Sequence, residues 1–207
     1  MRTHTCGELT EKNIGRQAEL AGWCHTRRDH GGVIFVDLRD RYGLTQIVFE
    51  PADKKTFKIA EHLRREDVIK VKGKVRKRPK GLENPKLTTG KIEVLVSELD
   101  ILNKAEVPPI EVDDRKEANE DARLKYRYLD LRRPIMQNRL QLRHNVIAAA
   151  REFFNQNKFL EVTTPLLVKS TPEGARDYVV PSRVNPGKFY ALPQSPQLYK
   201  QILMVAG

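Results

Sequence analysis

Apolar and polar positions alternate with a period of two along much of the first hundred residues, which is typical of β-strands. Five segments show the alternation, and turns rich in Gly and Pro separate several of them: residues 18–29, 33–40, 44–50, 67–78 and 91–102. Between the third and fourth segments, Asp53 is expected to cap a short helix over residues 53–64. Phe57, Ala60 and Leu63 would form the buried stripe of this helix.

Two of the predicted strands separate their faces clearly. In the second strand, Val33, Phe35 and Asp37 share one face, and Ile34, Val36 and Leu38 share the other. In the fourth strand, the apolar positions Ile69, Val71 and Val75 alternate with the basic positions Lys70, Lys72, Lys74 and Arg76. One face therefore packs in a core while the other meets solvent or phosphate. Five strands with a helix between the third and fourth predict an OB-fold, a small β-barrel that binds oligonucleotides.

The pattern changes after the fifth strand. Residues 103–114 contain the pair Pro108 and Pro109 and are typical of a linker, and helical periodicity follows. Pro134 is expected to begin a long amphipathic helix that ends near residue 157 and carries Leu142, Val146, Ala149 and Phe153 on one face. Residues 159–165 are expected to form a strand. The predicted fold class is α+β, with a barrel over 1–104, a hinge region over 105–133 and a second domain over 134–207.

Charge narrows the choice of partner. The 207 residues include 38 Lys and Arg against 27 Asp and Glu, which gives a net charge of +11. This balance favours a polyanion, nucleic acid first, although a solvated basic surface would explain much of it. The distribution adds to the total, because nine basic residues and only one acid, Glu83, lie between Lys70 and Lys91.

The sequence argues against several other classes. The N-terminus lacks the layout of a signal peptide, and no apolar stretch reaches the roughly 18 to 20 residues of a membrane helix, so a cytoplasmic protein is expected. Two cysteines, Cys6 and Cys24, provide neither a disulfide framework nor a paired zinc motif. Cys24, His25 and His30 lack a fourth ligand, and we expect no metal site.

On a nucleic-acid-binding barrel, the candidate residues are outward-facing groups that can stack on bases or form hydrogen bonds with them. Phe35 beside Arg27 and Arg28 could stack on a base while the arginines hold phosphate. Gln46 and Glu93 could read base edges from neighbouring strands. From the pattern alone, Phe35 is more typical of a core residue, and Gln46 and Glu93 are more typical of ordinary exposed polar groups.

Several longer strings narrow these alternatives. LKYRYLDLRRP at 124–134 and TPEGARDYVVPSRVNPGKFYALPQSPQLYKQ at 171–201 closely resemble bacterial-type aspartyl-tRNA synthetase, a class II enzyme. The opening MRTHTCGEL, the stretch AGWCHTRRDHGGVIFVDLRD and the string TGKIEVL resemble the same family, so the likeness covers essentially the whole chain. It implies an anticodon-binding OB-fold followed by the start of a class II catalytic domain, an antiparallel sheet with helices. The segment 134–165 would be class II motif 1 and a homodimer interface.

The resemblance also implies roles for residues of the barrel. Phe35 would stack on the middle anticodon base, Gln46 would hydrogen-bond within the anticodon, and Glu93 would contact the first anticodon base. Arg27 and Arg28 would hold the loop backbone, and Thr26 stands where the family usually has a third arginine. His30 and Gly81 match a pattern associated with relaxed anticodon reading, in members that charge both the aspartate and the asparagine tRNAs.

The same resemblance implies an aspartate pocket in the second domain. Glu173 would face the substrate ammonium from a lid loop in which Gly174 permits the hinge. Ser195, Gln197 and Lys200 would grip L-aspartate, with Lys200 paired to its side-chain carboxylate. A buried cation there would also reject asparagine, whose neutral amide leaves the lysine unpaired.

The implied reaction joins aspartate to tRNA in two steps that use ATP and Mg²⁺. The motif 2 and motif 3 arginines and the acidic Mg²⁺ ligands of the family would lie beyond Gly207, so no catalytic or metal-binding residue is assigned in this chain. We therefore expect the 207 residues alone to be inactive and to retain anticodon binding. The alternative is a free-standing OB-fold protein that binds tRNA without catalysis, which would have no need for the pocket residues between 171 and 200.

Overall fold

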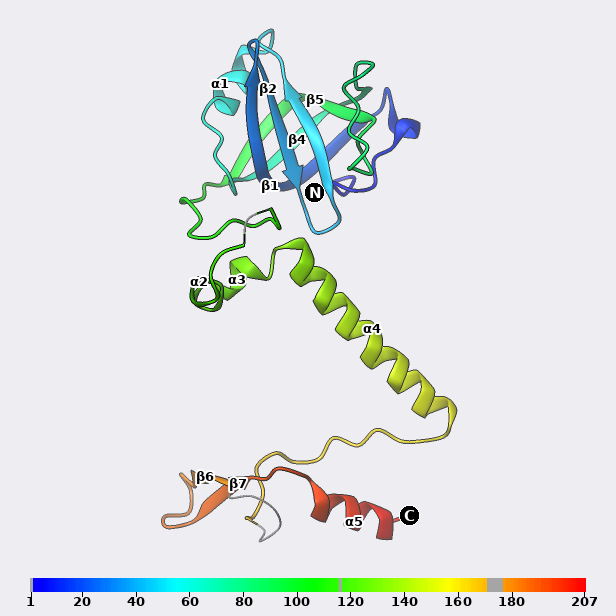
Figure 1. Ribbon diagram of the computed structural model, residues 1–207, viewed down its shortest axis with the longest axis vertical. Helices are drawn as coiled ribbons and strands as arrows, with labels where there is room; N and C mark the ends of the chain where they lie inside the picture. Colours follow the sequence, from blue (N-terminus) through cyan, green and yellow to red (C-terminus); the bar gives the residue numbers. More distant parts are fainter. Residues whose placement is uncertain (1, 116, 171–176) are drawn as a thin grey trace. The chain divides into compact units, whose positions relative to one another are not determined.

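The computed structural model describes residues 2–115, 117–170 and 177–207. The chain divides into two compact units, Met1–Pro134 and Ile135–Gly207. Figure 1 shows a β-barrel in the first unit and a long helix, a hairpin and a short helix in the second.

The first unit is built on a closed five-stranded barrel. Its strands are β1 (Gln17–His30), β2 (Val33–Arg39), β3 (Leu44–Phe49), β4 (Val68–Lys77) and β5 (Ile92–Asn103). They close in the order β1-β2-β3-β5-β4, and only β3 and β5 pair in parallel. A short 3₁₀ helix, η1 (Glu11–Asn13), precedes β1, and α1 (Lys54–Ala60) lies between β3 and β4 in sequence. The predicted OB-fold and the order of its elements are confirmed.

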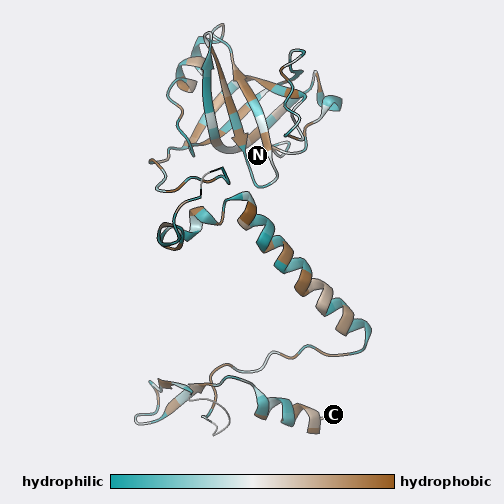
Figure 2. Cartoon of the chain, viewed as in Figure 1, coloured by the Kyte–Doolittle hydropathy of each residue, from teal (hydrophilic) through white to brown (hydrophobic). Residues whose placement is uncertain are grey.

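Burial follows the predicted alternation. Ile34, Val36 and Leu38 of β2 are fully buried in the core, whereas Phe35 between them is only partly buried. Ile69, Val71 and Val75 of β4 also lie in the core, and the basic positions between them face outward. Figure 2 shows hydrophobic and hydrophilic residues mixed along each strand, as this alternation requires. Asp53 caps α1 through the amides of Lys55 and Thr56, but the helix ends at Ala60, earlier than predicted.

Residues 105–133 pack within the first unit. The segment contains α2 (Glu120–Lys125) and α3 (Arg127–Asp130), and its Ile110, Val112 and Leu129 form a second small core. Asp113 pairs with Arg65 at 2.5 Å, and the Arg132 guanidinium lies 4.9 Å from the centre of the Trp23 ring. Contacts of this kind tie the predicted hinge region to the barrel.

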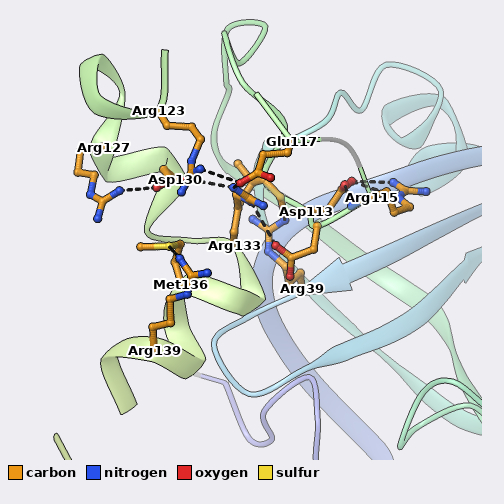
Figure 3. A network of polar contacts seen from close by, with 12 residues as sticks. Arg39, Asp113, Arg115, Glu117, Arg123, Arg127, Asp130, Arg133, Met136 and Arg139 are labelled. Carbon is orange, nitrogen blue, oxygen red and sulfur yellow. Dashed lines mark hydrogen bonds and ion pairs between the residues drawn. The ribbon is translucent and has the colours of Figure 1, made fainter. Parts of the chain in front are cut away.

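A buried carboxylate organises the end of this segment. Asp130 has no exposed surface and accepts hydrogen bonds from Arg123 Nε at 3.0 Å, Arg133 Nη1 at 3.1 Å and Arg127 Nη1 at 2.7 Å. Figure 3 shows the three arginines converging on Asp130. Arg133, itself almost fully buried, also pairs with Asp114 at 3.2 Å. The three basic residues of the helical turns therefore share one anionic centre.

Acidification is expected to release this segment from the barrel. Burial alone would raise the pKa values of Asp113 and Asp130, but hydrogen bonds from arginine bring both below their ordinary value. A carboxylate with a depressed folded-state pKa stabilises the fold above its unfolded pKa of about 3.9, and that contribution disappears as the pH falls toward the folded-state pKa. The fluorescence of Trp23, the only tryptophan, should therefore change below about pH 4. If the Trp23 fluorescence stays flat from neutral pH to pH ~2 in both the parent chain and Asp113→Asn, this expectation is contradicted.

Helix α4 (Pro134–Gln156) begins at the last residue of the first unit, and its remainder belongs to the second. The second unit also contains the antiparallel hairpin of β6 (Tyr178–Pro181) and β7 (Phe189–Leu192), and α5 (Gln197–Val205). The prediction that Pro134 begins a long helix is confirmed. On α4, three residues of the predicted apolar face are largely exposed: Leu142 at 65%, Val146 at 60% and Phe153 at 61%. In the described ranges, no helix combines the length and hydropathy needed to cross a membrane.

The predicted strand over residues 159–165 is wrong. These residues are irregular, and the nearest pairing along the chain is a single bridge between Val168 and Ala191. A strand exists only where a neighbour accepts its backbone hydrogen bonds. The described part of the chain supplies no such neighbour to this segment, whatever its β-propensity.

Candidate nucleic-acid interface

A β-bulge decides which side chains of β1 face outward. The register of β1 against β2 runs from Cys24↔Leu38 directly to Thr26↔Asp37, so His25 is the extra residue. Before the bulge, Ala18, Leu20 and Cys24 point into the core. After it the phase reverses, and Arg28 pairs with Phe35 and shares its outward face.

Phe35 lies on this outward face near the turn that joins β1 and β2. Its ring centroid is 6.3 Å from that of His30, with the two planes tilted by 56°. Because the core face of β2 is filled by Ile34 and Val36, Phe35 is an outward-facing aromatic residue rather than a core residue. Its ring is thus placed where a base could stack on it.

Gln46 and Glu93 meet on the neighbouring strands. Gln46 Nε2 donates to Glu93 Oε2 at 2.8 Å, and Arg76 Nε donates to Glu93 Oε1 at the same distance. Arg76 Nη1 continues to Glu50 at 2.6 Å. Glu93 is only 2% exposed, so its charge is held in place by these partners on both sides. Gln46 is also buried, so neither residue is the ordinary exposed polar group that the pattern alone favoured.

A second set of contacts joins β1 to the same face. Arg28 Nη2 donates to Asp37 Oδ1 at 2.9 Å and to Gln46 Oε1 at 3.4 Å. Thr26 Oγ1 donates to Asp37 Oδ2 at 2.5 Å. The hydrogen bonds therefore link residues of all five strands, from Thr26 on β1 to Arg76 on β4, and end at Glu50 just after β3. We call the residues of this network, together with Phe35 and His30, the recognition face.

Two predicted site residues, Arg27 and Gly81, are not part of the recognition face. Arg27 pairs with the buried Val36, and its Nε donates to the carbonyl of Ala60 at the end of α1, 3.0 Å away. The side chains of Arg27 and Arg28 therefore lie on opposite faces of β1. Gly81 lies in the loop between β4 and β5, where its φ of +87° favours glycine and its amide donates to Glu83 at 2.8 Å.

Sequence reasoning assigned no site role to Asp37, Arg76 or Arg78. Arg78 is 5% exposed, and its Nε donates to the carbonyl of Ile92 at 3.0 Å. Burial lowers its pKa, which nearby Glu93 and Asp37 oppose. Among the described residues, nothing accepts a hydrogen bond from its Nη2. The sequence carried part of the signal, because Asp37 and Arg76 alternate with buried apolar residues on β2 and β4. Arg78 lies just beyond the end of β4.

The predicted aspartate-pocket residues are only partly described. Glu173 and Gly174 lie outside the described residues. Ser195 precedes α5, and Gln197 and Lys200 lie in its first turn, three residues apart and hence on one side of the helix. All three side chains are exposed.

The two thiols and His25 do not make a reactive centre. Cys6 and Cys24 are buried and free, and burial raises the pKa of Cys24 to about 12. Burial followed by the nearby Arg39 lowers the pKa of His25, whose Nδ1 lies 2.9 Å from Arg39 Nη1. Within the described ranges, no group of His, Cys, Asp and Glu is arranged to hold a metal ion.

Comparison with protein families gives a consistent class. Residues 18–102 match the family described as OB-fold nucleic acid binding domain, and residues 119–207 match tRNA synthetases class II (D, K and N). The structure of asparaginyl-tRNA synthetase from Pyrococcus horikoshii, complexed with asparaginyl-adenylate, superposes with a TM-score of 0.82 at 29% identity. The match covers 98% of this chain and 45% of that one. A putative aspartyl-tRNA synthetase from Leishmania major Friedlin shares the fold with a TM-score of 0.84 at 22% identity, over 98% of this chain and 41% of that one. The fold and the two family matches therefore place the chain in the class of class II tRNA synthetases that carry an OB-fold.

Curated relatives narrow the class to a family. The aspartate–tRNA(Asp/Asn) ligase of Desulfosudis oleivorans is 61% identical, and that of Legionella pneumophila (strain Corby) is 56% identical; each match covers 100% of this chain and 35% of the relative. The chain belongs to the aspartyl-tRNA synthetase family of class II. It spans about a third, 35%, of the length of these relatives.

Proposed function

We propose that this chain is the anticodon-recognition part, together with the beginning of the aspartate-binding part, of an aspartate–tRNA ligase. The observation that carries the proposal is the recognition face, on which Phe35, Arg28, Gln46 and Glu93 lie together. The reaction of the whole enzyme would be ATP- and Mg²⁺-dependent activation of L-aspartate and its transfer to tRNA. Its tRNA substrates would be those of the similar ligases, whose name includes both Asp and Asn.

Each group on the recognition face has a distinct role in this proposal. Phe35 offers a flat apolar surface to the middle anticodon base, and stacking tolerates any base. Glu93 can only accept hydrogen bonds while ionised, so it favours a base whose Watson–Crick edge donates them. Arg28 supplies positive charge near the backbone. Stacking would therefore contribute affinity, and Glu93 with Gln46 would contribute the choice of base.

The exposed side chains of α5 suit the substrate end of the same enzyme. Lys200 would pair with the side-chain carboxylate of L-aspartate, and Ser195 and Gln197 would orient it by hydrogen bonds. Glu173 and Gly174 belong to the proposed lid. Dimerisation through 134–165 is also part of the proposal, and the exposed apolar residues of α4 support it, since such a stripe requires a partner.

Replacing Phe35 with alanine is expected to weaken RNA binding strongly. Loss of one stacked base costs about 1–3 kcal/mol, or roughly 5- to 150-fold in affinity. The measurement is titration of the 207-residue chain with aspartate and asparagine tRNAs over a salt series. Binding should fall as salt rises, because phosphate contacts release counterions. Equal affinity for both tRNAs would support the relaxed reading attributed to His30 and Gly81.

Tyr42→Ala is the matched control, because Tyr42 is a 60% exposed aromatic residue at the turn between β2 and β3. It should bind both tRNAs like the parent chain. Binding that is equally strong with and without the Phe35 ring, or no binding at all, would exclude the proposed role of the recognition face.

A further inference from the structure

We propose that Asp37 is a positioning residue for base reading: it orients Arg28 and thereby Gln46, and it increases discrimination while lowering general affinity for RNA. The inference rests on the proposed function. It concerns a residue of the recognition face that would not itself contact RNA.

Both oxygens of Asp37 are engaged by β1. Oδ1 accepts from Arg28 Nη2 at 2.9 Å and Oδ2 accepts from Thr26 Oγ1 at 2.5 Å. Asp37 is opposite Thr26 on one side and opposite Gln46 on the other, so it stands between the two strands that carry its partners. Its side chain is 20% exposed, whereas that of Arg28 is 46% exposed. The carboxylate thus lies deeper than the cation it holds.

The orientation passes from Asp37 to the base-reading groups. The Arg28 Nη2 that donates to Asp37 also lies 3.4 Å from Gln46 Oε1. Gln46 Nε2 donates to Glu93, so its amide can have only one orientation if both hydrogen bonds are kept. A free Arg28 would sample other rotamers and leave Gln46 Oε1 without this donor. Asp37 therefore keeps Gln46 and Glu93 in a single arrangement.

A carboxylate on a surface that meets RNA is unfavourable for affinity. Asp37 offsets part of the charge that Arg28 offers to a phosphate. A surface selected only for affinity would leave Arg28 unpaired. Such an acid makes physical sense where wrong partners must be rejected, because specificity is a difference between affinities and often requires an unfavourable element.

The test compares two hairpin RNAs with the 207-residue chain. One carries the aspartate anticodon, and the other is identical except for adenine in place of guanine at the first anticodon position. In Asp37→Asn we expect the ratio of the two affinities to fall about tenfold, mainly because the substituted hairpin binds more tightly. The salt dependence should become steeper by about one phosphate contact.

Asp100→Asn is the charge-matched control. Asp100 is exposed on β5 and lies opposite Lys70, outside the recognition face. It should raise affinity for both hairpins alike and leave their ratio unchanged. Thr26→Val is the second variant, because it removes one partner of Asp37 without a change of charge. It should lower the ratio without a steeper salt dependence, and Thr26→Ser should restore it.

Several outcomes would overturn the inference. If the parent chain discriminates between the hairpins and both Asp37→Asn and Thr26→Val discriminate equally well, Asp37 has no positioning role. The same holds if Asp100→Asn lowers the ratio as much as Asp37→Asn. If the parent chain binds neither hairpin, or binds both independently of Phe35, the proposed function itself fails and the inference fails with it. Thermal unfolding of each variant identifies any loss of fold, and Thr26→Val decides if Asp37→Asn does not fold.

Discussion

Replacing Glu93 with alanine is expected to lower both the stability of the barrel and its affinity for RNA. The substitution removes a 2% exposed carboxylate, leaving Gln46 Nε2 buried without an acceptor and Arg76 with only Glu50. Loss of one partner of a buried charged pair costs about 2–4 kcal/mol. For a domain of about 100 residues this corresponds to a fall in Tm of roughly 10–20 °C. The measurement is thermal unfolding followed by circular dichroism.

Glu98→Ala tests the same kind of change on an exposed pair. Glu98 accepts from Lys72 at 2.9 Å on the surface of the barrel, where water screens the interaction. Its unfolding temperature should barely move, and its affinity for RNA should be retained. If Glu93→Ala and Glu98→Ala unfolded at the same temperature, the buried hydrogen bonds of Glu93 would not hold the recognition face together. Glu93→Gln then separates the effect on stability from the effect on RNA affinity, because it keeps the shape of the side chain and removes its charge.

Replacing Asp130 with alanine is expected to unfold residues 105–133 while the barrel remains folded. Three arginines would lose their common acceptor, and Arg133 would remain buried with a weaker set of partners. Removing one partner from a buried charged cluster costs about 3–5 kcal/mol. That is a large part of what the small core of Ile110, Val112 and Leu129 can supply, since burying each side chain contributes about 1.5–3 kcal/mol before the entropy cost of ordering the segment is subtracted.

Limited proteolysis measures this local unfolding, because protease cleaves a segment that opens independently of the core. In Asp130→Ala, cleavage should occur within 105–133 and leave a resistant fragment that contains β1 to β5. Asp121→Ala is the control, since Asp121 is exposed on α2. Identical cleavage of the two variants would show that the arginine cluster does not hold the segment. Cleavage throughout the barrel would show that the two cores unfold together.

The sequence allowed part of the recognition face to be predicted. Alternation put Phe35 and Asp37 on one face of β2 and Ile34, Val36 and Leu38 on the other, and burial shows that the second face is the core face. The family resemblance added Gln46 and Glu93, which lie 2.8 Å apart on different strands, 47 residues apart in sequence. The resemblance could not tell which of Arg27 and Arg28 faces outward. Adjacent residues differ in their face only once the phase of the strand is known, and the bulge at His25 changes that phase within the strand.

Local sequence signals were misleading in two segments, the strand predicted at 159–165 and the linker predicted after the barrel. Apolar and β-branched residues make an extended strand favourable, but pairing with a neighbour decides whether it forms. Two adjacent prolines suggested a linker, yet Ile110 and Val112 pack with Leu129. In both segments, contacts with residues distant in sequence determined the outcome.

The sequence by itself determined the elements whose signals are local: the alternating faces of β2 and β4, the N-cap of α1, the start of α4 at Pro134, and the family. Only the tertiary structure decided which groups act together. Arg28 rather than Arg27 joins the recognition face, Asp37 holds it there, and Asp130 gathers three arginines. The physical reason is that periodicity and capping depend on neighbours within one or two turns, whereas hydrogen bonds between strands depend on register. A single bulged residue changes that register without leaving a recognisable pattern in the sequence.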